Sequence, residues 1–324
     1  MSFSGEVKSE AARKSNSARH CNIAEAAALI TFGGRMLADT IGTKRLRIQT
    51  ENAAVSRKCF TLLKKTFNIN TDVIIEKNIR LKKGNTYILE LVSPEDIGHV
   101  MLTCKLTETA LSAGGIAQSV HPLLVQKNCC KRAFIRGAFL AAGSLTDPEK
   151  SYHLEIVCRN YGQAEQLQEI MQHFELSAKI TERKNVHVVY IKDSAQIIQM
   201  LGIMEANVAL MDMENTRILK EMRNTVNRKV NCETANINKT VSAAVKQLAD
   251  IEFLKEQIGL AALPDELAQT AECRLRYPEA SLKELGEMAQ PPIGRSGMNH
   301  RLRKISKLAE EIRGETSITK EELL

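Results

Sequence analysis

The sequence contains no tryptophan, and aromatic residues make up only 4% of its 324 positions. Proteins that bind single-stranded nucleic acids stack the bases on aromatic side chains, so we expect any nucleic-acid partner to be a duplex. The chain also has no run of the roughly 20 apolar residues that cross a bilayer. Its first 20 residues contain no apolar stretch of the kind that forms a secretory signal. These absences predict a cytoplasmic protein without a membrane partner.

The eight cysteines show no repeated spacing, and Cys129 and Cys130 form the only close pair. In a chain of this size that pattern is typical of reduced thiols. A zinc site usually combines C-x-x-C with a second pair of ligands. Neither the cysteines nor the seven histidines provide such spacing. The sequence therefore predicts no metal ion and no cofactor.

Positive charge is concentrated in two parts of the chain. The formal net charge is +7, and the length of 324 residues suggests two or three domains. The first 128 residues carry 18 basic against 11 acidic side chains. From Arg295 to Lys307, five side chains are basic and none is acidic. Such a stripe suits a surface that faces phosphates, although a solvated helix face has the same pattern.

Two segments rich in alanine and glycine recur at an offset of 109 residues. They are EAAALITFGGRM and FIRGAFLAAGSL, and with that offset Ala28 matches Gly137 and Gly34 matches Gly143. Glycine costs a helix about 1 kcal/mol relative to alanine, so glycine in an apolar helix indicates a close backbone approach. Each segment is followed by the periodicities of strands, a helix, two strands and a further helix. The duplication predicts two similar halves related by a pseudo-twofold axis.

This repeat, with its two small-residue helices, resembles the LAGLIDADG homing-endonuclease fold. The resemblance implies an α+β domain in which the two motif helices cross with touching backbones, and paired sheets form a saddle suited to duplex DNA. An ordinary buried pair of Ala- and Gly-rich helices is the alternative. Basic side chains on a predicted strand of the saddle could contact phosphates or simply be solvated, and these are Lys44, Arg45 and Arg47.

The acidic residues of the nuclease chemistry are missing. In the family that the repeat resembles, the eighth letter of each motif is an acid, and the two carboxylates hold a divalent metal ion. Here these positions are Gly33 and Ala142, which have no ligand atom. Asp39 and Asp147 lie a few residues further on, but such a shift changes the geometry, and Asp147-Pro148 is typical of a turn. The sequence therefore predicts no catalytic residue, and a nuclease that uses Asp39 and Asp147 is the alternative.

The C-terminal region is a series of predicted helices. ENTRILKEMRNTVNRKV forms the first, NCETANINKTVSAAVKQLADIEFLKEQIG one or two more, and PDELAQTAECRLRYP another. Ser281 and Glu284 then form a capping box that opens a short helix, and Pro291-Pro292 ends it. A basic helix starts near Ser296 and carries one apolar stripe, made of Met298, Leu302, Ile305, Ala309 and Ile312.

A short helix, a turn and a basic helix follow one another in a helix-turn-helix, whose second helix lies in the major groove. The turn AQPPIGRSG is longer than usual, and an exposed helical hairpin is the alternative. Side chains near the start of a recognition helix reach base edges, and here these are Asn299, His300 and Arg303. The residues assigned to phosphates are Arg295, Arg301, Lys304 and Lys307, while Ser296 either caps the helix or bonds a phosphate.

Long stretches of the chain are similar to the WhiA family of bacterial sporulation regulators. They are CCKRAFIRGAFLAAGSLTDPEKSYHLEIV, VNRKVNCETANINKTVSAAVKQL, YPEASLKELGEM and PPIGRSGMNHRLRKI. The resemblance implies a LAGLIDADG-like domain without nuclease activity, joined to a C-terminal helix-turn-helix that resembles region 4 of sigma factors. It also implies a transcription regulator of sporulation or cell division that binds double-stranded DNA in the nucleoid. Another transcription regulator or RNA polymerase would be its protein partner.

The resemblance divides the chain into an N-terminal segment (1–20), two LAGLIDADG-like repeats (21–128 and 129–208), and a helical linker with the helix-turn-helix (209–324). Two other functions remain open from the residues alone. One is the metal-dependent nuclease described above. The other is a scaffold in which the saddle binds another protein and contact with DNA is incidental.

Overall fold

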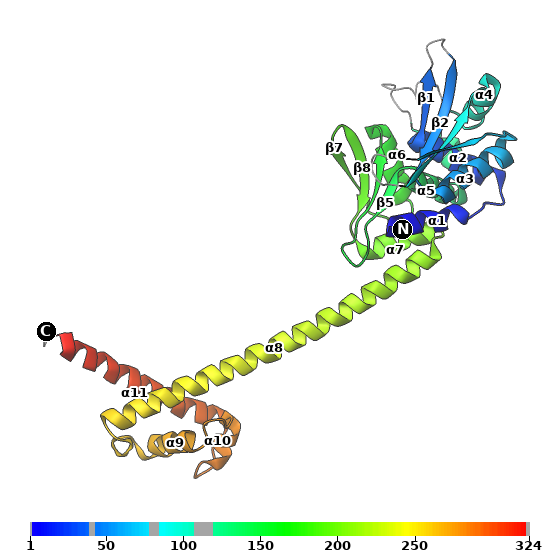
Figure 1. Ribbon diagram of the computed structural model, residues 1–324. Helices are drawn as coiled ribbons and strands as arrows, with labels where there is room; N and C mark the ends of the chain where they lie inside the picture. The colour runs from blue at the N-terminus through cyan, green and yellow to red at the C-terminus, as the bar shows by residue number, and fades with distance from the viewer. Residues whose placement is uncertain (1, 39–42, 78–83, 107–118, 322–324) are drawn as a thin grey trace. The chain divides into compact units, whose positions relative to one another are not determined.

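The computed structural model describes residues 2–38, 43–77, 84–106 and 119–321. These residues form two compact units, Met1–Glu221 and Met222–Leu324 (Figure 1). The division falls inside α8 (Asn207–Gln257), a single helix of 51 residues. The sequence analysis split this stretch into two or three helices, which is wrong. No glycine or proline lies between Asn207 and Gln257 to interrupt the helix.

The first unit contains the two expected repeats. The first repeat comprises α2 (Arg19–Gly33), β1 (Gly34–Ala38), β2 (Lys44–Thr50), α3 (Ala53–Phe67), β3 (Val73–Lys77), β4 (Asn85–Leu91) and α4 (Pro94–Thr103). The second comprises α5 (Asn128–Ala142), β5 (Gly143–Leu145), β6 (Leu154–Cys158), α6 (Tyr161–Gln172), β7 (Lys179–Arg183), β8 (Val186–Ile191) and α7 (Ser194–Ile203). Two further elements complete the unit, α1 (Phe3–Arg13) and the 3-10 helix η2 (Pro122–Val125).

Each repeat builds one antiparallel sheet of four strands. The strand orders are β1-β2-β4-β3 and β5-β6-β8-β7, so the two sheets have the same topology. Corresponding glycines begin the first strand of each, and Gly34 pairs with Ile48 as Gly143 pairs with Ile156. The predicted duplication, including the match of Gly34 to Gly143, is confirmed. Figure 1 shows the α2 and α5 helices next to the sheets of both repeats.

The alternation of side chains along the strands determines which face of each sheet is covered. Leu46 and Ile48 on β2 are buried in the core together with residues of α3, while Arg45 and Arg47, which alternate with them, are half-buried on the opposite face. Successive side chains of a strand point to opposite faces. The helices therefore cover the apolar face of the sheet, and the basic side chains occupy the other face.

The α2 and α5 helices pack against each other at Gly137. An added Cβ at this position would lie 2.6 Å from the carbonyl oxygen of Glu25 and 2.9 Å from Cβ of Ala28. Real Cβ atoms do not approach other atoms this closely, so only glycine permits the observed backbone separation. The close approach that the sequence predicted from this glycine is therefore present.

A network of buried charges lies beside the helix contact. Glu25 is fully buried and accepts hydrogen bonds from Arg136 Nε at 2.9 Å and from Asn16 Nδ2 at 2.7 Å. Lys58 Nζ lies 3.1 Å from the same carboxylate. Burial lowers the pKa of Lys58, and the charge of Glu25 opposes this effect. The network joins α2, α3, α5 and the segment after α1, because each partner comes from a different element.

The second unit is all-helical. Its elements are the C-terminal part of α8, the 3-10 helix η3 (Leu260–Ala262), α9 (Asp265–Arg276), α10 (Leu282–Met288) and α11 (Arg295–Glu321). The expected capping box is present, since Ser281 and Glu284 bond each other's backbone N–H groups. Gly286 of α10 accepts a hydrogen bond from the Ile293 N–H at 2.9 Å. A Cβ at Gly286 would collide with the Ile293 carbonyl oxygen, so glycine lets the turn fold back onto α10.

Among the described residues, no helix combines the length and the apolar composition that a bilayer crossing requires.

We predict that Gly137→Ala lowers the free energy of unfolding of the first unit by about 1–3 kcal/mol through overpacking. This loss is expected even though alanine favours a helix more than glycine does. Gly98→Ala is the matched control, because a Cβ at this α4 position meets no atom within 4 Å. Urea denaturation followed by circular dichroism measures both variants. If Gly137→Ala is as stable as Gly98→Ala, the two helices do not touch at Gly137.

Candidate nucleic-acid interface

The α11 helix buries one face and exposes the other. Its apolar stripe packs onto the neighbouring helices, since Met298, Leu302, Ile305 and Ala309 are at most 1% exposed. The expected stripe is therefore correct, with Ile312 partly buried at its end. The side chains on the other face are exposed, namely Arg295, Ser296, His300, Arg303, Lys304 and Lys307. Asn299 and Arg301 are half-buried at the border.

Contacts distinguish the eight residues that the sequence assigned to DNA. Arg301 Nη2 lies 3.3 Å from Glu266 of α9, and its side chain is only 16% exposed. Lys307 pairs with Glu311 at 3.6 Å in solvent, where such a pair contributes little. Arg303 and Lys304 make no side-chain hydrogen bond or ion pair with any described residue. These two cations, like the exposed Arg295 at the start of the helix, are therefore available for a ligand.

Ser296 does not cap the helix. The α11 helix begins at Arg295, and the Met298 N–H donates to the Gly294 carbonyl oxygen at 3.0 Å. Gly294 therefore occupies the cap position, and Ser296 lies in the first turn with its side chain exposed. Of the two roles expected for Ser296, the capping role is wrong and a contact with phosphate remains a prediction.

Polar contacts that the sequence analysis missed hold the helices of the second unit together. Arg313 Nη1 donates to the buried Asp250 of α8 at 2.7 Å, and its guanidinium lies 4.6 Å from the centre of the Phe253 ring. Arg274 of α9 is also buried and donates to Gln247 at 2.9 Å and to the Ala280 carbonyl oxygen at 2.6 Å. Burial lowers the pKa of Arg274. The Arg313 bond ties the basic helix to α8, and the Arg274 bonds tie α9 to α8 and to the segment before α10.

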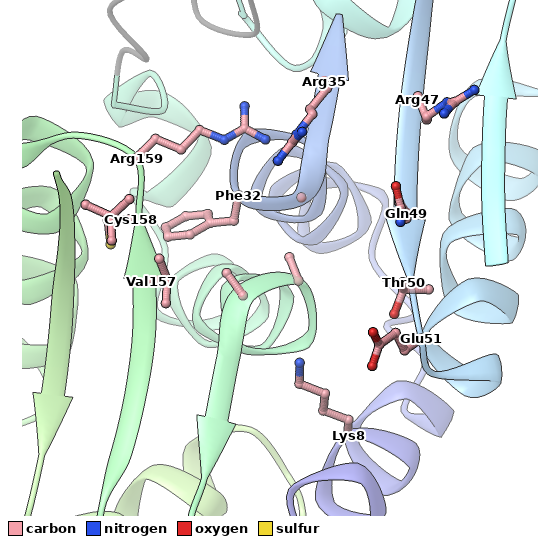
Figure 2. Close-up of a pocket in the computed structure, with 14 residues that line it drawn as sticks. Lys8, Phe32, Arg35, Arg47, Gln49, Thr50, Glu51, Val157, Cys158 and Arg159 are labelled. Carbon is pink, nitrogen blue, oxygen red and sulfur yellow. The ribbon is translucent and has the colours of Figure 1, made fainter. Parts of the chain in front are cut away.

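A second basic surface is a cleft of about 640 Å³ in the first unit. It lies at the C-terminal ends of α2 and α5, where both Gly33 and Ala142 line it. Figure 2 shows side chains from both repeats around this cleft. Its basic lining residues are Lys8, Arg35, Arg47 and Arg159, and Glu51 is the acidic residue of the described lining.

The cations of the cleft differ in how far they are neutralised. Arg47 Nη2 lies 2.5 Å from Glu90, and Arg45 lies 3.9 Å from the same carboxylate. Figure 2 shows the guanidinium groups of Arg35 and Arg159 directed toward each other near Phe32. Burial and the charge of Arg35 lower the pKa of Arg159. Two facing guanidiniums repel each other, so an anion between them would be stabilised.

Lys8 stands at the other end of the cleft, near Glu51. Burial lowers the pKa of Lys8 to about 8, and the charge of Glu51 opposes this shift. The sequence analysis proposed Lys44, Arg45 and Arg47 for this surface and missed Lys8, Arg35 and Arg159. The position of Arg35 could have been a signal, because it directly follows the second glycine of the first motif.

The cleft lacks the paired carboxylates that a divalent ion needs. Gly33 and Ala142 occupy the expected positions and contribute no ligand. The Asp147 carboxylate accepts the Glu149 N–H at 2.9 Å and so stabilises the turn after β5. Asp147 is outside the described lining of the cleft, and Asp39 lies outside the residues that the structure describes. The described arrangement suits an anion better than a metal ion.

Two repeats packed through a glycine contact, followed by a basic helix-turn-helix, define a LAGLIDADG-like protein with a C-terminal helix-turn-helix domain. Family models match in the same order. They are the WhiA N-terminal LAGLIDADG-like domain at residues 19–103, the WhiA LAGLIDADG-like domain at 131–223 and the WhiA C-terminal HTH domain at 226–309.

Relatives match over nearly the whole chain. The chain is 52% identical to the probable cell division protein WhiA of Lachnoclostridium phytofermentans, over 97% of this chain and 100% of the relative. It is 49% identical to the protein of the same name from Desulforamulus reducens, over 97% of each. The crystal structure of full-length DUF199/WhiA from Thermatoga maritima is 26% identical, with a TM-score of 0.57 over 96% of this chain and 99% of that one. The chain belongs to the WhiA family.

We predict that Arg35→Ala weakens the binding of the full-length protein to a short random-sequence duplex and lowers the salt slope by about one counterion. The reason is the loss of one cleft cation that would contact a phosphate. Lys64→Ala removes the same charge from an exposed position on α3, which packs on the covered face of the sheet. Fluorescence anisotropy over a range of salt concentrations compares the two. Identical losses for both variants would exclude the cleft from the contact surface.

Proposed function

We propose that the protein is a sequence-specific transcription regulator that reads duplex DNA with α11. One observation carries this proposal. Arg303 and Lys304 have no partner among the described residues, on the exposed face of a helix whose other face is locked into a four-helix core. A side chain that is charged, exposed and rigidly mounted suits recognition of a fixed target. The family's helix-turn-helix domain is consistent with this function.

The positions along the helix suggest which side chains contact bases and which contact phosphates. Asn299, His300 and Arg303 lie in its first three turns and would reach base edges, with Arg303 suited to a bidentate guanine contact. Arg295, Ser296, Lys304 and Lys307 would contact phosphates. Arg301 is assigned a smaller part than the sequence suggested, because Glu266 already neutralises it.

The target genes of this regulator would be those of cell division or sporulation, since the matched relatives are named probable cell division proteins. Binding to chromosomal DNA would place the protein in the nucleoid. A DNA-bound regulator acts on transcription through RNA polymerase or through another regulator, and either would be its protein partner.

We predict that Arg303→Ala costs about 1–3 kcal/mol of binding free energy on the preferred sequence and much less on random duplex. The preferred sequence is obtained by selection from a random duplex library with the wild-type protein. Lys307→Ala is expected to weaken binding to both duplexes equally and to reduce the salt slope, because a phosphate contact carries no sequence information.

Lys283→Ala is the matched control for Lys307→Ala. Both lysines are 78% exposed at the side chain and pair with a glutamate one helical turn later, but Lys283 lies on α10. The loss of binding free energy in Arg301→Ala should be closer to that of Lys283→Ala than to that of Arg303→Ala. If Arg303→Ala binds the selected sequence as tightly as wild type, another element reads the DNA.

The same proposal includes the absence of nuclease activity, because Gly33 and Ala142 cannot hold a catalytic metal ion. We predict that the purified protein leaves supercoiled plasmid intact in the presence of Mg²⁺ or Mn²⁺ at high protein concentration. Agarose electrophoresis measures the nicked fraction. Metal-dependent nicking that disappears in Asp147→Asn would establish the alternative nuclease.

A further inference from the structure

The N-terminal ends of the two motif helices carry a cluster of side chains that neither the cleft nor α11 involves. His20 and Cys21 lie in the first turn of α2, and Cys129 and Cys130 lie in the first turn of α5. The potential ligand atoms of all four residues lie within 4.8 Å of one another. No other group of this kind occurs among the described residues.

The distances fit a tetrahedral metal ion. His20 Nδ1 lies 3.1 Å from Cys130 Sγ and 3.3 Å from Cys21 Sγ. A zinc ion with bonds of about 2.3 Å to sulfur and 2.0–2.1 Å to nitrogen separates its ligand atoms by roughly 3.5–3.8 Å. All four atoms lie within 4.8 Å of one another, so side-chain movements of up to about 1 Å would place them around one ion.

The surroundings of the four side chains also favour the binding of a metal ion. Cys21 and Cys130 are 5% and 4% exposed, and they pack with Ala24 and Ala133 in a small apolar cluster. His20 and Cys129 are exposed, so an ion can enter from solvent. Neither helix has a side-chain cap at its N-terminus. The dipoles of these two helix N-termini would offset the negative charge of the thiolates.

We propose that His20, Cys21, Cys129 and Cys130 form a structural zinc site that joins the two repeats. Three thiolates and one neutral imidazole are the donors that Zn²⁺ binds in closed structural sites. Binding displaces the thiol protons, so the affinity falls as the pH is lowered. The ion would fasten the helix ends opposite the cleft and tie together residues that lie 110 positions apart in the chain.

This site was not foreseen because the sequence test considered only ligand pairs with short spacings. Each helix supplies an adjacent pair, and the two pairs are far apart in the chain. The remaining cysteines behave differently. Cys59, Cys104 and Cys158 are buried singly, and burial raises the pKa of each thiol to about 12. Cys232 is exposed on α8.

The test uses untagged full-length protein, purified under reducing conditions and dialysed against metal-free buffer. We expect about one zinc ion per chain by mass spectrometry of the metal. Cobalt added to the chelator-treated protein should give the visible bands of tetrahedral Co²⁺ and the near-ultraviolet bands of thiolate-to-cobalt charge transfer. Chelation should also lower the melting temperature.

Variants test whether the zinc content, the cobalt spectrum and the melting-temperature change depend on the four side chains. The double variant of the two exposed ligands, His20→Ala with Cys129→Ser, should lose the metal and the cobalt spectrum, and chelator should no longer change its melting temperature. Cys232→Ser is the matched control and should keep all three properties. Two results would overturn the proposal. One is a metal-free reduced protein without cobalt bands, and the other is a disulfide within the cluster, seen as a mass lower by two hydrogen atoms.

Discussion

The backbones of α2 and α5 approach so closely at Gly137 that an added Cβ would lie 2.6 Å from the Glu25 carbonyl oxygen. This contact determines the rest of the first unit. Because the helices run side by side, their C-terminal ends meet at the cleft and their N-terminal ends bring the histidine and the three cysteines together. It also encloses Glu25, Arg136 and Lys58, whose buried charges are compensated by one another, by Asn16, by Glu205 beside Arg136 and by the Lys14 carbonyl oxygen that accepts from Lys58. Removing one partner of such a network leaves an uncompensated charge.

The C-terminal ends of α2 and α5 can favour either a cation or an anion, depending on two side chains. With carboxylates at the ends of α2 and α5, the cleft would attract a divalent cation. With Gly33 and Ala142 there, the charge is set by Arg35, Arg159 and Lys8, and the surface becomes attractive to phosphate. Burial and, to a smaller extent, the charge of Arg35 lower the pKa of Arg159, and a bound anion would oppose both effects. The same frame can therefore carry either charge at this cleft without a change of fold.

In the second unit, one face of α11 is fixed by packing and its other face exposes cations that can bind a ligand. The apolar stripe from Met298 to Ala309 and the bond from Arg313 to Asp250 hold α11 against its neighbours. Arg303 and Lys304 project from the other face without an internal partner among the described residues. Arg301 shows the contrast, since the same residue type two positions earlier is bound to Glu266. Charge alone therefore does not identify a ligand-binding residue.

Patterns local in the chain were sufficient to predict the duplication, the close approach at Gly137, the capping box of Ser281 and the buried stripe of α11. Each depends on periodicity or on the backbone freedom of one residue, which neighbours in the chain determine. The continuous α8, the partner of Arg301, the facing Arg35 and Arg159, and the cluster of His20 with three cysteines were not predicted. The continuity of α8 follows from the local absence of glycine and proline, which the prediction did not use. The other features depend on which distant side chains become neighbours, and only the packing of α2 on α5 and of α9 on α11 decides that. The amino-acid sequence by itself thus determined the elements and the family, while the tertiary structure decided which charges and thiols meet.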